Sequence, residues 1–161
     1  MTPYDINVIV NIMAELPLAT PGAVAIIETP EHFIAEGRPD IPGGLAYSGR
    51  IQLFGGHVEE EPGETIRREL SEELGLRLDE TPPSVWSGVV PSQNRRGELV
   101  RRHVSLFRVA IEPTVALRLK VPGTIIRIPK TVEGVEAYRE QLTPFAFRAL
   151  YKAVTGEPWE E

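Results

Sequence analysis

The chain has 161 residues, of which 42% are hydrophobic and 25% charged, as is typical of a single soluble globular domain. It contains no cysteine, which excludes disulfides, thiolate zinc sites and cysteine nucleophiles. It has neither an apolar run of about 18 residues nor a secretory signal, so we expect no membrane span and a cytoplasmic protein. We therefore predict one domain over residues 1–161.

The acidic residues are concentrated in one segment. Residues 59–80 contain nine acidic residues and three arginines, which accounts for the whole net charge of −6. The rest of the chain is balanced. This distribution favours a cation site over a nucleic-acid surface, which would need a basic face.

The N-terminal part of the chain predicts short strands separated by turns. Residues 4–13 are rich in β-branched side chains and predict a strand within an N-terminal segment of residues 1–20. A strand, its antiparallel partner, a glycine-rich loop and a further short strand are then predicted at residues 23–28, 32–36, 37–50 and 50–54. The last strand ends at Gly55 and Gly56, where glycine allows positive φ and close backbone approach.

The centre of the chain predicts an amphipathic helix that ends at Gly75. Glu69, Glu72 and Glu73 have i, i+3, i+4 spacing and therefore share one face of this helix. The adjoining apolar stripe, which would pack on a sheet, consists of Ile66, Leu70 and Leu74. Like charges on one face cost about 0.2–0.5 kcal/mol per pair. A solvated acidic helix tolerates that cost, and a bound Mg²⁺ or Mn²⁺, which prefers carboxylate oxygens, would reverse it.

A long β-hairpin is predicted after this helix. Strand-like runs at residues 84–90 and 99–111 flank a polar turn at residues 91–97. The turn and the return strand carry Arg95, Arg96, Arg101 and Arg102. These side chains are suited to binding diphosphate or a dimer partner, although we favour the simpler interpretation of solvated hairpin charges.

Two more strands and two helices are predicted in the rest of the chain. The strands are expected at residues 114–120 and 123–128, and the first helix at residues 132–142. The last helix is expected at residues 143–156, with Thr143 as N-cap and Gly156 as its stop. Its buried face is predicted to consist of Phe147, Leu150, Tyr151 and Val154.

The segment of residues 68–76 matches a known signature position for position. It reads R-E-L-S-E-E-L-G-L, and the second half of the Nudix hydrolase signature is R-E-U-x-E-E-x-G-U, where U is aliphatic. Upstream, residues 55–59 and 62–65 resemble the G-G-x-U-E and P-G-E-T pieces of that family. The chain therefore resembles the Nudix hydrolases.

The first half of the signature departs from the family pattern. From Gly56 to Arg68 the chain is two residues shorter, and Phe54 stands where the family commonly has proline. Either Glu64 or Glu60 can take the place of the family's first glutamate. We favour Glu64, because Pro62-Gly63 is a turn signal and because Glu64 is four residues before Arg68, a favourable spacing for an ion pair.

The resemblance implies an α/β fold, a Nudix-like α/β/α sandwich with a mixed β-sheet between helices. It implies a Nudix-type pyrophosphohydrolase that cleaves the diphosphate bond of a nucleoside diphosphate linked to another group, such as an NTP, ADP-ribose or a sugar nucleotide. Mg²⁺ or Mn²⁺ would be held by Glu69, Glu72, Glu73 and a carbonyl of Gly55 or Gly56, with Glu69 equally able to act as general base. A structural role in the motif is implied for Arg68, Glu64, Glu60 and Gly75.

Further residues and partners are also predicted. Substrate contacts are assigned to Arg50, Gln52 and Arg101. The candidates for an additional acid near the site are Glu133 and Glu136, although we favour ordinary helix-surface acids at these positions. A homodimer through the hairpin or the N-terminal strand is a further expectation. The alternatives are a Nudix-fold module that binds nucleotide without turnover and an RNA-processing protein. The balanced charge outside the signature disfavours RNA.

Overall fold

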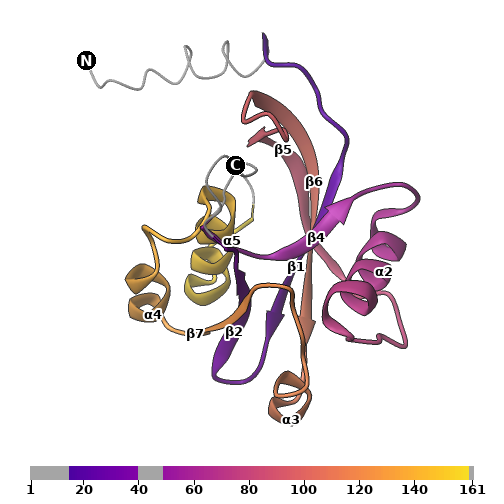
Figure 1. The fold of residues 1–161 in the computed structure, drawn as a ribbon. Helices are drawn as coiled ribbons and strands as arrows, with labels where there is room; N and C mark the ends of the chain where they lie inside the picture. The colour runs from indigo at the N-terminus through magenta and orange to yellow at the C-terminus, as the bar shows by residue number, and fades with distance from the viewer. Residues whose placement is uncertain (1–14, 40–48, 160–161) are drawn as a thin grey trace.

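The computed structural model describes residues 15–39 and 49–159, and these form a mixed β-sheet between helices (Figure 1). The sheet has seven strands within the described part of the chain. Their bounds are β1 Gly22–Glu28, β2 His32–Gly37, β3 Ile51–Gln52, β4 Phe54–His57, β5 Ser84–Gln93, β6 Leu99–Ala110 and β7 Thr124–Pro129. The predicted fold class is therefore confirmed. The strand predicted at residues 4–13 lies outside the described residues.

Strand β1 is the centre of the sheet. Along one edge it pairs in parallel with β6, from Gly22 opposite Val104 onward. Its other edge is shared by two antiparallel partners: β4 pairs with its first half and β2 with its end. On its other edge β6 pairs with β5, its antiparallel hairpin partner, and β7 pairs with the outer edge of β2. The glycine-containing strand β4 is thus fixed directly against the central strand.

Strands β2 and β3 hold together the two ends of the segment between them, at Arg38 and Arg50. They pair at Gly37 opposite Ile51, and the Arg38 N–H donates a hydrogen bond of 3.0 Å to the Arg50 carbonyl. The chain therefore leaves the sheet and returns to it at one place.

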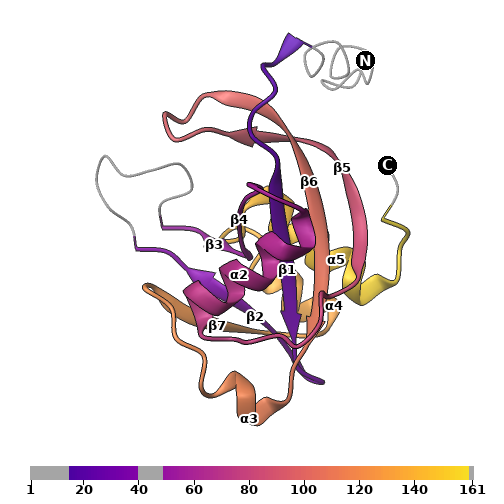
Figure 2. The ribbon, with the colours of Figure 1, turned by 90° about the vertical axis from the view of Figure 1, so that its right-hand side faces the viewer.

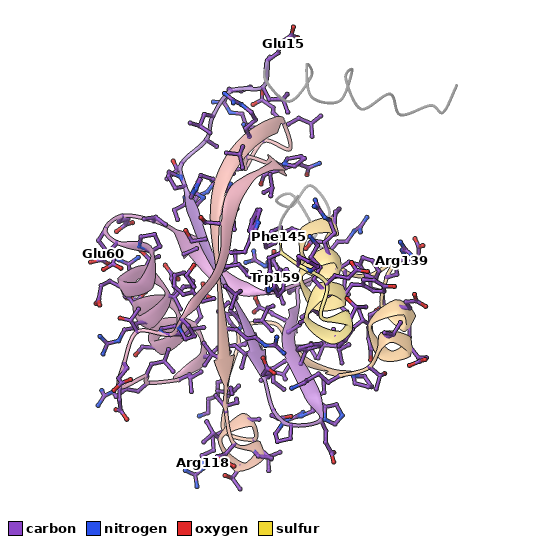
Figure 3. All side chains as sticks on the ribbon, turned by 180° about the vertical axis from the view of Figure 1, so that it is seen from behind. Glu15, Glu60, Arg118, Arg139, Phe145 and Trp159 are labelled. Carbon is purple, nitrogen blue, oxygen red and sulfur yellow. The ribbon has the colours of Figure 1, made fainter. Side chains whose placement is uncertain are left out.

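The helices cover opposite faces of the sheet. Helix α2 (Pro62–Leu74) covers one face, and α4 (Val132–Ala137) and α5 (Pro144–Thr155) cover the other, as the view turned by 90° also shows (Figure 2). In Figure 3, Glu60 beside α2 and Arg139 beyond α4 mark these two sides. No helix in the described ranges is long and apolar enough to span a membrane.

Each face of the sheet has its own buried core. On the α2 side, the predicted stripe of Ile66, Leu70 and Leu74 is buried against Phe54 and Phe107. On the other side, the main buried residues are Ile26, Phe33, Ile128, Leu142, Ala146 and Leu150. Side chains of β1 contribute to both cores, because neighbouring residues of a strand point to opposite faces of the sheet.

Three predictions about secondary structure need correction. The strand predicted at residues 114–120 is wrong: Pro113 starts a short helix, α3 (Pro113–Ala116), because proline suits the first helical position. The strand predicted at 50–54 is divided at Leu53 into β3 and β4, which pair with different strands. The helix predicted at 132–142 ends at Ala137.

The hairpin and the last helix are confirmed with adjusted details. The β5–β6 arms extend to Gln93 and Leu99, so the turn is shorter than predicted. Helix α5 starts at Pro144 and ends before Gly156, which has a positive φ of 73°. Of its predicted buried face, Leu150 is fully buried, whereas the other three are partly buried: Phe147, Tyr151 and Val154.

We predict that Leu70→Ala lowers the free energy of unfolding by about 2–5 kcal/mol, because Leu70 is 0% exposed and its loss leaves a cavity beneath α2. Urea denaturation followed by circular dichroism measures this change. The matched control is Leu117→Ala, since Leu117 is 75% exposed and the same truncation there should change stability by less than about 0.5 kcal/mol. Equal effects in the two variants would contradict the burial of this stripe.

Candidate active site

Helix α2 has well-defined ends that set the direction of its side chains. It begins at Pro62 in the first helical position. It ends at Gly75, whose φ of 70° lets its own N–H donate to the Ser71 carbonyl at 3.1 Å and lets the Leu76 N–H donate to the Leu70 carbonyl at 3.1 Å. Gly75 is confirmed as the stop of the helix. With the apolar stripe buried, the side of the helix that carries Glu69 and Glu73 faces strand β4 at Gly55 and Gly56.

The glycine pair lies inside strand β4, where we expected glycine to allow positive φ or close backbone approach. Neither glycine is among the described residues with positive φ. Gly55 is needed because a side chain there would collide with the backbone of Ala23 in β1. At Gly56, a Cβ atom would lie 2.6 Å from Oε1 of Glu69. Glycine is required here for close approach, and Gly56 makes room for the Glu69 carboxylate.

Glu69 and Glu73 form a hydrogen-bonded carboxyl pair one helical turn apart. Burial raises the pKa of Glu73, and the hydrogen bond and charge of Glu69 raise it further, to about 8 from an ordinary 4.5. The charge of Glu36 acts in the same direction, and that of Arg38 opposes it. Without a cation, the pair therefore retains a shared proton near neutral pH.

Glu72 does not join this pair. It is exposed and does not line the cleft that Glu69 and Glu73 border. At 100° per residue, Glu72 lies 100° from Glu73 around the helix. Within the ranges that the structure describes, no three acidic or histidine side chains converge as a ready-made metal site. The role of Glu72 as a metal ligand stays a prediction.

Arg68 connects the loop before the helix to the carboxyl pair. Its guanidinium lies 2.9 Å from Oε1 of Glu60, 3.5 Å from Oε2 of Glu59 and 3.4 Å from Oε1 of Glu69. Arg68 thus fixes the loop relative to Glu69 from the solvent side. The ion pair predicted between Glu64 and Arg68 is absent from the salt bridges of the described residues.

Arg68 is instead paired with Glu59, Glu60 and Glu69, and the Glu64 carboxylate lies 3.6 Å from Arg67 and 3.4 Å from the Thr81 hydroxyl. Pro62 and Gly63 form the first turn of the helix, where we predicted a separate turn. Gly63 is buried against the Thr81 side chain, which leaves no room for a Cβ atom. This geometry supports Glu60 as the first glutamate of the motif.

The carboxyl pair borders an open cleft of about 920 Å³ whose lining carries both signs of charge. Glu69, Glu73, the two glycines, the exposed His57 and Glu98 of the hairpin turn belong to this lining. Arginines from the end of β2 and from the hairpin also line this cleft: Arg38, Arg95, Arg96 and Arg102. A ligand that binds here meets carboxylates and guanidinium groups at the same time, as a metal-bound phosphate chain requires.

The predicted substrate contacts are only partly brought together. Gln52 lines this cleft and an adjoining one. Arg50 lines only the adjoining cleft and donates to the Leu142 carbonyl at 3.1 Å. Arg101 lines neither, because its Nε donates to the Leu16 carbonyl at 2.9 Å. The neighbouring residue Arg102, which the sequence marked only as one of four hairpin arginines, lines both clefts.

The two candidates for an additional acid do not reach the cleft. Glu133 and Glu136 are exposed on α4, which packs on α5 across the sheet from α2, and neither lines the cleft. The acid near Glu73 is instead Glu36, a buried residue of β2. The sequence showed only that Glu36 lies in a predicted strand. It did not show which strands β2 pairs with, and this pairing brings Glu36 close to Glu73.

A comparison with known families fits this site. The NUDIX domain profile matches residues 20–149. The chain belongs to the Nudix family. This membership confirms the resemblance found in the signature and supports a Nudix pyrophosphohydrolase that acts on nucleoside diphosphate derivatives. Nudix hydrolases generally use a divalent metal ion.

Solved structures show the same fold. A mutT/nudix family protein from Listeria innocua is 20% identical, with a TM-score of 0.66, over 87% of this chain and 94% of that one. The MutT protein from Methanosarcina mazei Go1 is 22% identical, with a TM-score of 0.59, over 91% and 99%. A bifunctional NMN adenylyltransferase/ADP ribose pyrophosphatase from Francisella tularensis, complexed with AMP and Mn, is 15% identical, with a TM-score of 0.60, over 91% and 44%. No curated protein matches the chain.

We predict that Glu73→Gln stabilises the metal-free protein increasingly as pH rises. The pKa of Glu73 is raised to about 8 in the folded chain from an ordinary 4.5, so the folded state binds a proton that the unfolded state lacks between these values. Wild-type stability from this group is therefore lost as pH rises through this window, and glutamine has no such proton to lose. The measurement is the melting temperature in EDTA at several pH values between about 5 and 8.5.

The control for this titration is Glu136→Gln, the same substitution at an exposed residue outside the cleft. Its difference from wild type should stay nearly constant across the pH range. The assignment is contradicted if the Glu73→Gln difference is as flat as that of the control.

Proposed function

We propose that this Nudix protein is a Mg²⁺- or Mn²⁺-dependent hydrolase that cleaves the diphosphate bond of a nucleoside diphosphate linked to another group. The observation that carries the proposal is the Glu69–Glu73 pair, held against Gly56 in a cleft that arginines also line. Two adjacent carboxylates repel each other unless a proton or a cation compensates them. A divalent cation and a phosphate chain match the two signs of charge in the cleft.

The donor set fits a hard divalent cation. Glu69 and Glu73 would supply carboxylate oxygens, and Gly55 or Gly56 a backbone carbonyl, with substrate phosphate and water as further ligands. Glu72 is the additional predicted ligand, and reaching a cation held by the pair would require its exposed side chain to turn toward the cleft. When bound, the cation would neutralise charge that develops on the diphosphate and lower the pKa of the attacking water.

The protein side chains have separable tasks in this reaction. Glu69, whose side chain is 18% exposed at the edge of the cleft, can accept the proton of the attacking water. Arg68 holds Glu69 and the loop residue Glu60 in place. The arginines of the cleft bind phosphate oxygens, since a guanidinium makes paired hydrogen bonds to them.

The first substrate to test is ADP-ribose. It has the required form, a nucleoside diphosphate linked to a second group, and the Francisella tularensis structure with this fold is named as an ADP ribose pyrophosphatase. A panel with nucleoside triphosphates, sugar nucleotides and dinucleoside polyphosphates, each with Mg²⁺ or Mn²⁺ and with EDTA, separates the substrate classes.

A homodimer remains part of the proposal. Two large apolar side chains of the hairpin arms are exposed, Val89 at 38% and Leu99 at 57%, and Leu18 beside the hairpin is 62% exposed. Light scattering after gel filtration gives the mass directly.

We predict that Glu73→Gln lowers metal-dependent turnover of the best substrate by about 100-fold or more, because it removes a carboxylate from the cation and water site. The measurement is release of phosphate in the presence of a coupled phosphatase. Glu136→Gln is the control and should retain wild-type activity. Full activity in Glu73→Gln would refute the assignment of the pair.

A further inference from the structure

Arg102 lies at the rim of the sheet, where it reaches both faces. Strand β1 begins at Gly22, opposite Val104 of β6, so Arg102 extends past the start of β1. Gly22 has no side chain to block it: a Cβ atom there would lie 3.3 Å from Cδ of Arg102. The Arg102 side chain therefore passes over the end of the central strand.

Two clefts meet at this side chain. One is the cleft of Glu69 and Glu73, and the other, of about 510 Å³, lies between the hairpin, β3 and the start of α5. Arg102 and Gln52 line both. The second cleft is mainly apolar, and no acidic residue of the described chain lines it. Its apolar lining includes Leu53, Val90, Leu99, Val104 and Phe145, the last marked in Figure 3.

The guanidinium of Arg102 has only neutral partners in the described chain. It donates to the Thr20 carbonyl and, through Nε at 3.4 Å, to the Ser92 hydroxyl. No ion pair joins it to a described carboxylate. Partial burial lowers its pKa, which shows that water compensates its charge incompletely. An anion at this point would supply the missing counter-charge.

We propose that Arg102 is a substrate-binding residue that holds a phosphate at the junction of the two clefts, an inference that rests on the proposed function. The diphosphate extends from the Glu69–Glu73 pair to Arg102, and the organic group attached to the Arg102-bound phosphate occupies the second cleft. The preferred substrates are therefore diphosphates with a nucleoside-sized organic group on that side. A volume of about 510 Å³ lies within the usual range of small-molecule sites.

The adjacent Arg101 provides a matched control. It has the same chemistry and the same strand, but its Nε binds the Leu16 carbonyl and it lines neither cleft. We expect Arg102→Gln to raise KM for ADP-ribose about 10-fold or more, with kcat within about 3-fold, because a charge-assisted hydrogen bond is lost. Arg102→Lys should recover part of the loss, and Arg101→Gln should stay within about 2-fold of wild type.

Binding without turnover separates this inference from the proposed function. Calorimetric titration of ADP-ribose and of inorganic pyrophosphate in EDTA compares wild type, Arg102→Gln and Phe145→Ala. Arg102→Gln should weaken binding of both probes about 10-fold or more. Phe145→Ala should weaken only ADP-ribose, because pyrophosphate has no group for the second cleft. Melting temperatures near that of wild type identify folded variants, and Arg102→Lys serves where glutamine unfolds the protein.

The outcomes are distinct. Unchanged ADP-ribose binding in Arg102→Gln, or an equal loss in Arg101→Gln, overturns the role of Arg102 whatever the turnover. Loss of binding in Arg102→Gln, in a wild-type protein that binds ADP-ribose but cleaves no member of the panel, supports Arg102 and refutes the hydrolase. A wild-type protein that neither binds nor cleaves the panel overturns both.

Discussion

The contact between the Glu69 carboxylate and Gly56 is the constraint on which the site depends. A Cβ atom at position 56 would lie 2.6 Å from Oε1 of Glu69, so the carboxylate lies directly against the backbone of strand β4. β4 is in turn fixed to β1 by backbone pairing, and α2 is fixed by its buried stripe. The carboxyl pair is therefore positioned by a paired strand and a packed helix, the kind of support that a precise binding site needs.

The electrostatics of the site follow from this arrangement. Glu73 shares a partly buried position with Glu69, which keeps its pKa high, and Arg68 approaches Glu69 from outside. The cleft arginines come from other elements, the end of β2 and the hairpin. Positive and negative groups thus reach one cleft without all pairing with each other, and this leaves both signs of charge available to a ligand.

Local signals in the sequence were sufficient for the elements that depend on them. The apolar stripe and Gly75 predicted the body and end of α2, and Pro144 and Gly156 predicted both ends of α5. The same kind of signal misled us at Pro62-Gly63, which form a helical turn because Gly63 packs on Thr81, far along the chain. Strand propensity predicted a strand at residues 114–120, but Pro113 starts helix α3 there.

The residues of the site that we missed depend on pairing between distant segments. Arg101 and Arg102 are equivalent in composition, and only the register of β6 against β1 shows which one crosses the rim at Gly22. The partners of Glu36 likewise follow from the position of β2 in the sheet. The Glu69–Glu73 pair on α2 was accessible from spacing, because a helix brings i and i+4 together by itself.

The pairing of β2 with β3 brings the two ends of the connecting segment together at the sheet. Because Arg38 and Arg50 are joined by a backbone hydrogen bond, the chain between them can change in length without moving either strand. Doubling such a segment costs only about 0.6 kcal/mol in closure entropy. Arg38 at one end of the segment and Gln52 just beyond the other line the clefts, whereas the Glu69–Glu73 pair is built from other elements. Substitution at Arg38 or Gln52 can therefore alter the lining of the clefts while the carboxyl pair on α2 stays in place.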